Sequence, residues 1–252
     1  MNQLWPTALV LSCLAGTATA QEQRLRIELE GGVLGTRNME IRGFQQPNAT
    51  RDWGRSGAAV AARAEGWLVN PAGWNYGLVV QPLDLRYSDV IKADLNYKGA
   101  VYRKGDAGKL EYNFSTVRGS ANYPLLQSAD GQDYLRAGGS VIARYARVAL
   151  STGQKGFTDT NFIVIPVANL EAQKSLGQGY SLFTRADFLP GIGGNVFLDG
   201  LYDVFVGIRH PMRGGATLDA GVRLFFGGYD PKKADDYANN IFFNSVTVRY
   251  AW

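Results

Sequence analysis

The last eleven residues of the chain, 242–252, alternate between apolar and polar side chains up to the final residue. The apolar side of this segment carries Phe242, Val246, Val248, Tyr250 and Trp252. Asn244 is its one polar member, and the opposite side includes Thr247 and Arg249. Because successive side chains of a strand point to opposite faces, the pattern predicts a strand with one apolar and one polar face. Such a strand at the end of a chain is typical of a transmembrane β-barrel, whose last strand closes against its first.

The same two-residue period recurs along the chain, with turn signals between the periodic segments. It predicts ten strands over residues 24–34, 57–69, 74–87, 109–119, 134–148, 161–173, 180–189, 195–209, 216–227 and 241–252. Turns are expected at 70–73, 124–133, 176–179 and 211–215, of which 124–133 is long for a turn, and loops at 36–56, 88–108, 149–160, 190–195 and 229–240. Residues 88–108 fit either a loop with its own hairpin or two further membrane strands. Eight or twelve strands remain open, because a single sequence defines strand ends poorly. No apolar run approaches the roughly 18 residues of a membrane-spanning helix.

The C-terminal pattern resembles that of bacterial outer-membrane β-barrels, whose assembly machinery recognises it. The resemblance is to the small class of eight to twelve strands, and it covers the chain after its N-terminal segment. It implies an all-β fold, an antiparallel up-and-down barrel of about ten strands, in the bacterial outer membrane. It also implies outer-membrane lipid, lipopolysaccharide and the barrel assembly machinery as partners. The apolar residues 242, 246, 248, 250 and 252 would then be the assembly signal.

The N-terminal twenty residues predict a cleaved signal peptide. Residues 8–15 are mostly apolar, and Ala18-Thr19-Ala20 has the small-residue pattern of a cleavage site. Cleavage would leave a single domain, residues 21–252. A lipoprotein signal around Cys13 is a weaker alternative. Cys13 is the only cysteine, so a chain beginning at Gln21 has neither disulfides nor thiolate metal sites.

Most of the predicted strands carry charged residues on their polar side. The predicted inward-facing bases are Arg24, Arg26, Arg63, Arg136, Arg144, Arg185, Arg209, Arg223 and Arg249. The predicted inward-facing acids are Glu28, Glu30, Glu65, Glu111, Glu171, Asp187, Asp199, Asp203 and Asp219. An Arg or Lys in the middle of the lipid costs about 2–4 kcal/mol, so these side chains should point into the barrel. In a narrow lumen they should pair, which leaves a narrow water path or none.

The remaining charges and aromatic residues suggest contacts at the membrane. Lys and Arg exceed Asp and Glu by only four, which does not suggest nucleic-acid binding. The lysines gather in the predicted outer loops, as solvated residues or as contacts for anionic lipopolysaccharide: Lys92, Lys98, Lys104, Lys109, Lys155, Lys232 and Lys233. Aromatic residues near strand ends fit the girdles of a barrel: Trp67, Trp74, Tyr76, Tyr180, Phe188, Tyr202, Phe226, Tyr250 and Trp252.

No residue pattern predicts catalysis, a metal site or a cofactor. His210 is the only histidine and stands in a predicted turn, without a serine–histidine or histidine–carboxylate arrangement. Asp230, Asp235 and Asp236 do not have the spacing of a calcium loop. We therefore expect a non-enzymatic barrel with a charge-filled lumen that serves envelope integrity or surface interaction. The alternatives are a narrow porin-like channel, a barrel enzyme acting on lipid or peptide, and a soluble periplasmic β-protein.

Overall fold

The computed structural model describes residues 24–42, 59–70, 73–97, 100–153, 155–190, 200–229 and 238–252. Almost all of them are in strands. The first eight strands are β1 (Arg24–Arg42), β2 (Ala59–Val69), β3 (Asn75–Gln81), β4 (Asp84–Val90), β5 (Leu95–Tyr97), β6 (Ala100–Tyr102), β7 (Ala107–Gln127) and β8 (Tyr134–Thr152). The others are β9 (Gly156–Gly177), β10 (Tyr180–Leu189), β11 (Leu201–Pro211), β12 (Thr217–Tyr229) and β13 (Ala238–Ala251), with a short 3-10 turn, η2 (Arg213–Gly215), before β12. The predicted signal peptide lies outside the described residues.

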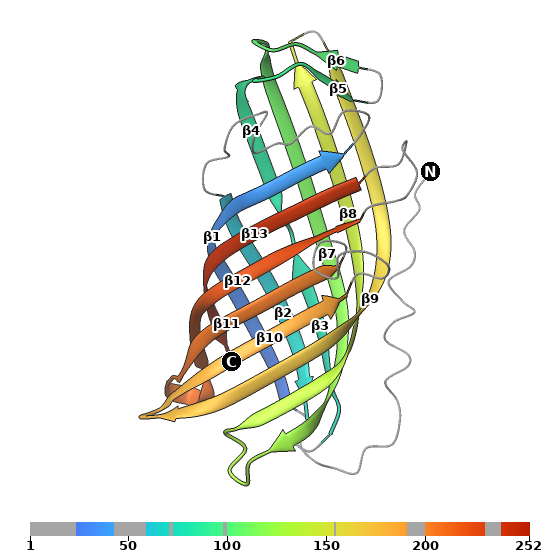
Figure 1. Cartoon of the computed structure of the whole chain (residues 1–252). Coiled ribbons are helices and arrows are strands. Elements are labelled where there is room, and N and C mark those ends of the chain that lie inside the picture. The colour runs from blue at the N-terminus through green and yellow to red at the C-terminus, as the bar shows by residue number, and fades with distance from the viewer. Residues whose placement is uncertain are drawn as a thin grey trace, which may run out of the picture.

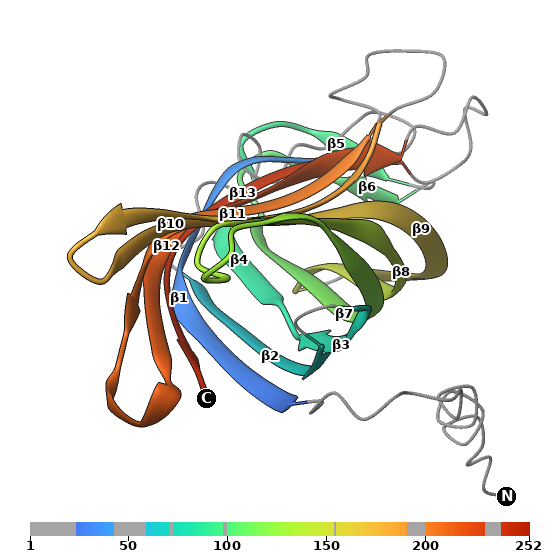
Figure 2. The same ribbon diagram turned by 90° about the horizontal axis from the view of Figure 1, so that it is seen from below.

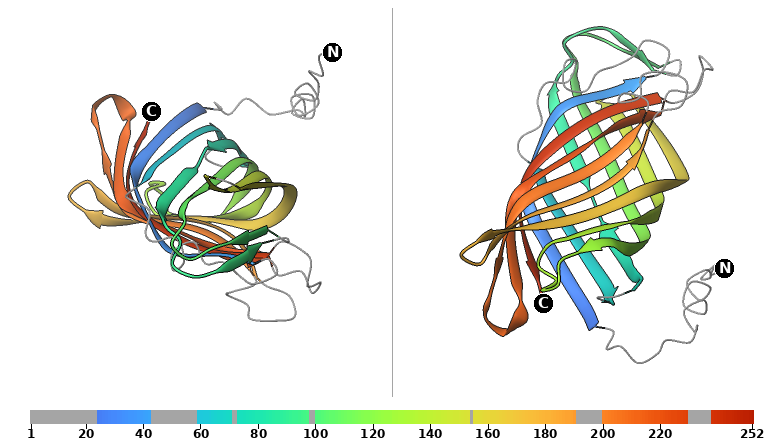
Figure 3. Two further views of the ribbon diagram at one scale, coloured as in Figure 1. Left: turned by 90° about the horizontal axis from the view of Figure 1, so that it is seen from above. Right: turned by 60° about the horizontal axis from the view of Figure 1, so that its bottom comes forward.

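The strands form a closed antiparallel barrel (Figures 1 and 2). β1 pairs with β2 on one side and with β13 on the other, and the backbones of Ile27 and Trp252 exchange hydrogen bonds of 2.9 and 3.0 Å. In Figure 3 the red β13 accordingly runs beside the blue β1. β3 and β4 both pair with β7, and together they make one wall strand that is interrupted at Pro82, which has no N–H to donate. With β3 and β4 taken together, the barrel has ten strands, as predicted.

The two ends of the barrel differ. The end with residue 24 and the C-terminus has short connections at 128–133, 178–179 and 212–216, and we call it the turn end. At the opposite, loop end, β4, β7, β8 and β9 project beyond the ends of β1, β12 and β13 (Figure 1). A membrane strand needs about 9–11 residues. β7 has 21 residues and β9 has 22, so this wall is long enough to cross the membrane and to extend well beyond it.

The structure corrects one predicted loop and decides between the two alternatives for another. Residues 149–160 are mostly paired strand, because β8 and β9 stay in register as far as Ser151 and Gly156. Inside this extension, Val148 and Leu150 belong to an apolar cluster against which Phe157 packs, and their burial favours continued pairing. Within 88–108, β5 and β6 pair only with each other, so this segment is a loop with its own hairpin. Residues 191–195 and 230–237 of the last two predicted loops lie outside the described residues, whereas residues 229 and 238–240 belong to the paired strands β12 and β13.

The outer surface of the barrel is apolar where the pattern predicted it. Val246, Val248, Tyr250 and Trp252 are exposed, whereas Thr247 and Arg249 are almost completely buried. Aromatic residues lie near the turn end, where Trp74 packs on Tyr123 and Tyr250 packs on Trp252. The prediction that Trp67 belongs to the aromatic girdle is wrong, because its side chain is 1% exposed and points into the barrel. None of the described segments is a helix with the length and hydrophobicity required to span a membrane.

The Asp133 carboxylate joins the turn at 128–133 to the neighbouring strand β9. Asp133 accepts a hydrogen bond from the Lys174 side chain and one of 2.7 Å from the backbone N–H of Ser175. These bonds, with that of Lys174 the stronger influence, hold the pKa of Asp133 below its usual range. The carboxylate therefore stabilises the turn above the unfolded pKa of about 3.9, and this stability is lost as the pH falls through the folded pKa.

We expect Lys174→Met to raise the pKa of Asp133, because the variant loses the stronger of the two bonds. An NMR titration of the Asp133 carboxyl carbon in detergent micelles measures this change. Lys155→Met, at the loop end, is the control and should leave the titration where it was. An unchanged Asp133 midpoint in Lys174→Met would show that the Lys174 contact does not form in solution.

Candidate functional site

The inside of the barrel has two layers. Charged side chains from most of the strands fill the half nearer the turn end, and we call them the ionic layer. Apolar side chains fill the interior nearer the loop end, and we call them the apolar layer. A strand whose inward residues change from charged to apolar along its length contributes to both. On β7, for example, Arg118 belongs to the ionic layer and Leu110, Tyr112 and Phe114 to the apolar layer.

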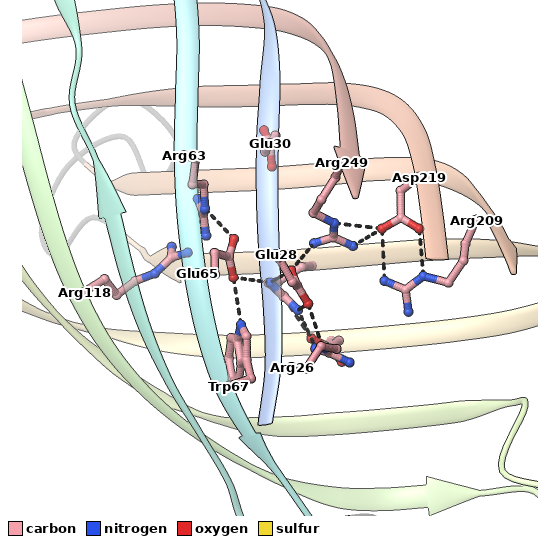
Figure 4. Close-up of polar contacts among 12 residues, drawn as sticks. Arg26, Glu28, Glu30, Arg63, Glu65, Trp67, Arg118, Arg209, Asp219 and Arg249 are labelled. Carbon is pink, nitrogen blue, oxygen red and sulfur yellow. Dashed lines mark hydrogen bonds and ion pairs between the residues drawn. The ribbon is translucent and has the colours of Figure 1, made fainter. Parts of the chain in front are cut away.

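Arg185 on β10 is the centre of the ionic layer. Its Nη1 donates to Glu65 Oε2 at 2.5 Å and to Glu28 Oε2 at 3.2 Å, and its Nε donates to Glu171 Oε2 at 2.8 Å. All four side chains are at most 2% exposed. Trp67 Nε1 donates to Glu65 at 2.8 Å (Figure 4), and the Trp67 ring lies 4.7 Å from the Arg185 guanidinium. One guanidinium thus joins carboxylates on β1, β2 and β9. It can do so because a guanidinium has several N–H donors.

A second cluster surrounds Asp203 on β11. Arg63 on β2 and Arg118 on β7 donate to its Oδ2 at 2.9 and 3.1 Å. Arg223 on β12 donates to its Oδ1 at 2.6 Å. Arg118 also donates to Asp187 on β10. Three strands, β2, β7 and β12, therefore supply the arginine partners of these two carboxylates.

A third cluster surrounds Asp219 on β12. Arg209 makes a forked contact with it, with Nε to Oδ1 at 2.8 Å and Nη2 to Oδ2 at 3.0 Å. Arg249 donates from Nε to Oδ2 at 2.7 Å, and its Nη1 forms an ion pair of 3.1 Å with Glu28 (Figure 4). Because Glu28 also contacts Arg185, the third cluster is continuous with the first.

These contacts cross the lumen and do not merely follow its wall. In the order of strands around the barrel, β2 and β10 are opposite one another, and the contact of Glu65 with Arg185 joins them. Arg63 joins β2 to β11, and Arg118 joins β7 to β10 and β11. The residues that make them are nearly inaccessible to solvent. The ionic layer therefore fills the cross-section of the barrel at this level.

The structure places most of the predicted inward charges inside the barrel. Buried members of the predicted set are Glu28, Glu30, Arg63, Glu65, Arg136, Glu171, Arg185, Asp187, Asp203, Arg209, Asp219, Arg223 and Arg249. Arg26 and Arg144 are partly buried, and Arg24 is exposed at the rim of the turn end. Asp199 lies outside the described residues.

One predicted residue points the other way, and one inward residue was missed. Glu111 was predicted to face the lumen, but it is 40% exposed and pairs with Arg147 on the outer face. Arg118, which is 3% exposed, was not predicted. The signal was present, because Arg118 shares the even-numbered side of its strand with Phe114, and that side is the inward one here. The apolar residues at the start of β7 concealed it, since they suggested that the even side faced lipid.

Among the described residues the inward-facing bases outnumber the inward-facing acids, and Asp199, one of the nine predicted acids, lies outside these residues. The inward-facing bases of the described residues are Arg26, Arg63, Arg118, Arg136, Arg144, Arg185, Arg209, Arg223 and Arg249. The inward-facing acids are Glu28, Glu30, Glu65, Glu171, Asp187, Asp203 and Asp219. Nine bases thus face seven acids in the described part of the chain. Arg136 and Arg144 are the two for which no carboxylate of the described residues lies in ion-pair distance.

The apolar layer was not predicted at all. Its buried members are Leu34, Leu83, Leu85, Tyr87, Ile91, Leu95, Tyr102, Leu110, Tyr112, Phe114, Ala146, Val148, Leu150 and Phe243. Leu95 and Tyr102 come from the β5–β6 hairpin, so this hairpin packs onto the inner side of the projecting wall. The lumen is therefore charged only in part, and its loop end is filled by a hydrophobic core.

His210, the only histidine of the sequence, contacts an aromatic ring. His210 lies at the turn end, where its ring packs on Tyr180 with 4.7 Å between centroids, and its Nδ1 is buried without a hydrogen bond. In the described ranges no three His, Cys, Asp or Glu side chains gather as metal ligands would. The predicted acidic group Asp230, Asp235 and Asp236 lies outside the described residues.

The fold is similar to known outer-membrane barrels. No protein-family model and no curated protein matches the chain. Among solved structures, the outer membrane protease OmpT of Escherichia coli matches with a TM-score of 0.57 and 11% identity, over 90% of this chain and 95% of that chain. The attachment invasion locus protein Ail of Yersinia pestis matches with a TM-score of 0.38 and 6% identity, over 90% and 99% of the two chains, a likeness too weak to add to the assignment. The chain has the fold of the small bacterial outer-membrane β-barrels, and its apolar outer surface places it in the bacterial outer membrane.

Proposed function

We propose that the protein is a non-conducting outer-membrane barrel that acts as a rigid scaffold for contacts at the cell surface. The observation that carries this proposal is the ionic layer, whose buried contacts join opposite strands across the lumen. A small barrel has room inside for little more than its own side chains. A solute would have to separate several charge-assisted hydrogen bonds at once, and these are the strong ones. The apolar layer adds a second obstacle at the loop end.

The projecting wall supports the surface role. β7, β8 and β9 extend beyond the neighbouring strands, and the β5–β6 hairpin stiffens them from inside. The exposed bases on this part of the chain are Arg86, Lys92, Arg103, Lys104, Lys109 and Lys155. Arg86, Lys92 and Arg103 are paired with Asp84, Asp89 and Asp94, so the other three bases are the ones suited to contact with the anionic groups of lipopolysaccharide. The wall would then hold the barrel in place and present a fixed surface.

Conductance in planar bilayers tests the closed lumen. We expect the folded protein to give no reproducible current steps at any applied voltage, because the ionic layer leaves no continuous water path. Insertion is verified separately on vesicles prepared from the same sample, by heat-modifiable migration on gels and by protection of the strands from protease. Clear and reproducible steps from protein that has passed both checks would overturn the proposal in favour of a channel.

A further inference from the structure

A small cavity lies where the ionic and apolar layers meet. Its volume is about 30 Å³, which is room for about two water molecules. Its apolar wall includes Phe114, Ile142, Phe225 and Phe243. Its charged wall consists of Arg63, Arg118, Arg144 and Arg223, with Glu30 and Asp203. Four positive groups therefore face two negative groups around one cavity.

Arg144 on β8 is the unusual member of this lining. Of the described residues, none places a carboxylate within ion-pair distance of it, and its Nε and Nη2 are buried without a hydrogen-bond partner. The Phe114 ring lies 4.0 Å and the Phe225 ring 5.2 Å from its guanidinium carbon. Contacts of a cation with ring faces stabilise the charge but leave the N–H groups unpaired. These N–H groups are the part of Arg144 still able to hold a ligand.

The other arginines of the lining add free donors to those of Arg144. Nη2 of Arg63 and Nε of Arg118 are also buried without a hydrogen bond. The two carboxylates are already engaged, because Arg223 donates to both oxygens of Glu30 at 2.7 and 2.6 Å, and three arginines donate to Asp203. Within the described lining, every buried side-chain nitrogen or oxygen that lacks a partner is thus a guanidinium nitrogen.

We propose that this cavity binds a small inorganic anion of the size of chloride, held by Arg144 together with Arg63 and Arg118. A buried positive charge without a partner is costly, and an anion removes that cost, whereas water only hydrates it. Guanidinium groups donate strong, charge-assisted hydrogen bonds to an anion. The volume suits a halide better than an organic acid of the size of gluconate or a lipid tail. The site goes beyond the scaffold role, because it makes the packing of the lumen depend on an anion.

Bromide can replace chloride and be located directly. We expect crystals grown without chloride and soaked in sodium bromide to show an anomalous peak within hydrogen-bonding distance of the Arg144 guanidinium. Arg144→Gln should lose the peak. Arg147→Gln is the matched control, since Arg147 lies on the same strand but points outward and is 39% exposed. Water alone in the cavity of the wild-type protein, or a bromide peak that persists in Arg144→Gln, would overturn the proposal.

Thermal unfolding in detergent tests the same site in solution. At equal ionic strength, we expect the wild-type protein to unfold at a higher temperature in chloride than in gluconate, which is too large for the cavity. The difference should disappear in Arg144→Gln and remain in Arg147→Gln. A wild-type protein with equal midpoints in the two salts would contradict the site, even if Arg144→Gln fails to fold. An equal rise in all three proteins would show a general salt effect and would also contradict it.

Discussion

Arg185→Leu is expected to lower the free energy of unfolding of the barrel by about 3–5 kcal/mol. The change removes one guanidinium and leaves Glu28, Glu65 and Glu171 buried without their shared partner. Leucine fills part of the space but donates no hydrogen bond. Denaturant unfolding in detergent measures the loss of stability. The Arg185 guanidinium lies over the Trp67 ring, so the fluorescence of Trp67 reports on the ionic layer.

The control for Arg185→Leu is Arg86→Leu. Arg86 pairs with Asp84 at 2.8 Å, but its side chain is 71% exposed, and an exposed pair contributes about 0–1 kcal/mol. Each variant removes one guanidinium group, a buried one in Arg185→Leu and an exposed one in Arg86→Leu. If both lost the same small amount of stability, the buried carboxylates would not depend on Arg185, and the ionic layer would be more hydrated than its burial indicates.

Val246→Arg is expected to destabilise the barrel by about 2–4 kcal/mol. Val246 is 65% exposed on the outer face of β13, six residues before the C-terminus. With a rise of about 3.3 Å per residue and a tilted strand, that spacing brings it near the middle of the hydrocarbon layer. Reversible unfolding from lipid vesicles measures the cost of placing the guanidinium there.

Leu25→Arg is the matched control for Val246→Arg. Leu25 is also exposed, at 63%, but it lies at the rim of the turn end. An arginine near the interface costs about 0–1 kcal/mol, because its side chain reaches the headgroups. Equal and small losses at the two positions would mean that the outer face does not contact lipid, and the membrane assignment would be wrong.

The barrel could be predicted from the sequence because alternation is a local property. A strand between lipid and an enclosed lumen must change polarity at each residue, and this period is visible without knowing which strands are neighbours. For the same reason most inward charges could be predicted, including Arg185 and Asp203. Where one strand changes its inward character, as β7 does between Phe114 and Arg118, the local rule assigns the wrong face.

The pairing of charges depended on the closed structure. Arg185 and Glu65 are 120 residues apart, and only closure of the barrel brings their strands to opposite sides of one lumen. Whether a charge has a partner follows from the register and tilt of all the strands together, so the unpaired Arg144 has no signature in the sequence. Local alternation was thus sufficient to predict the barrel and its place in the membrane. The plugging of the lumen and the position of the cavity were decided by tertiary structure, because side chains distant in sequence meet only across the closed barrel.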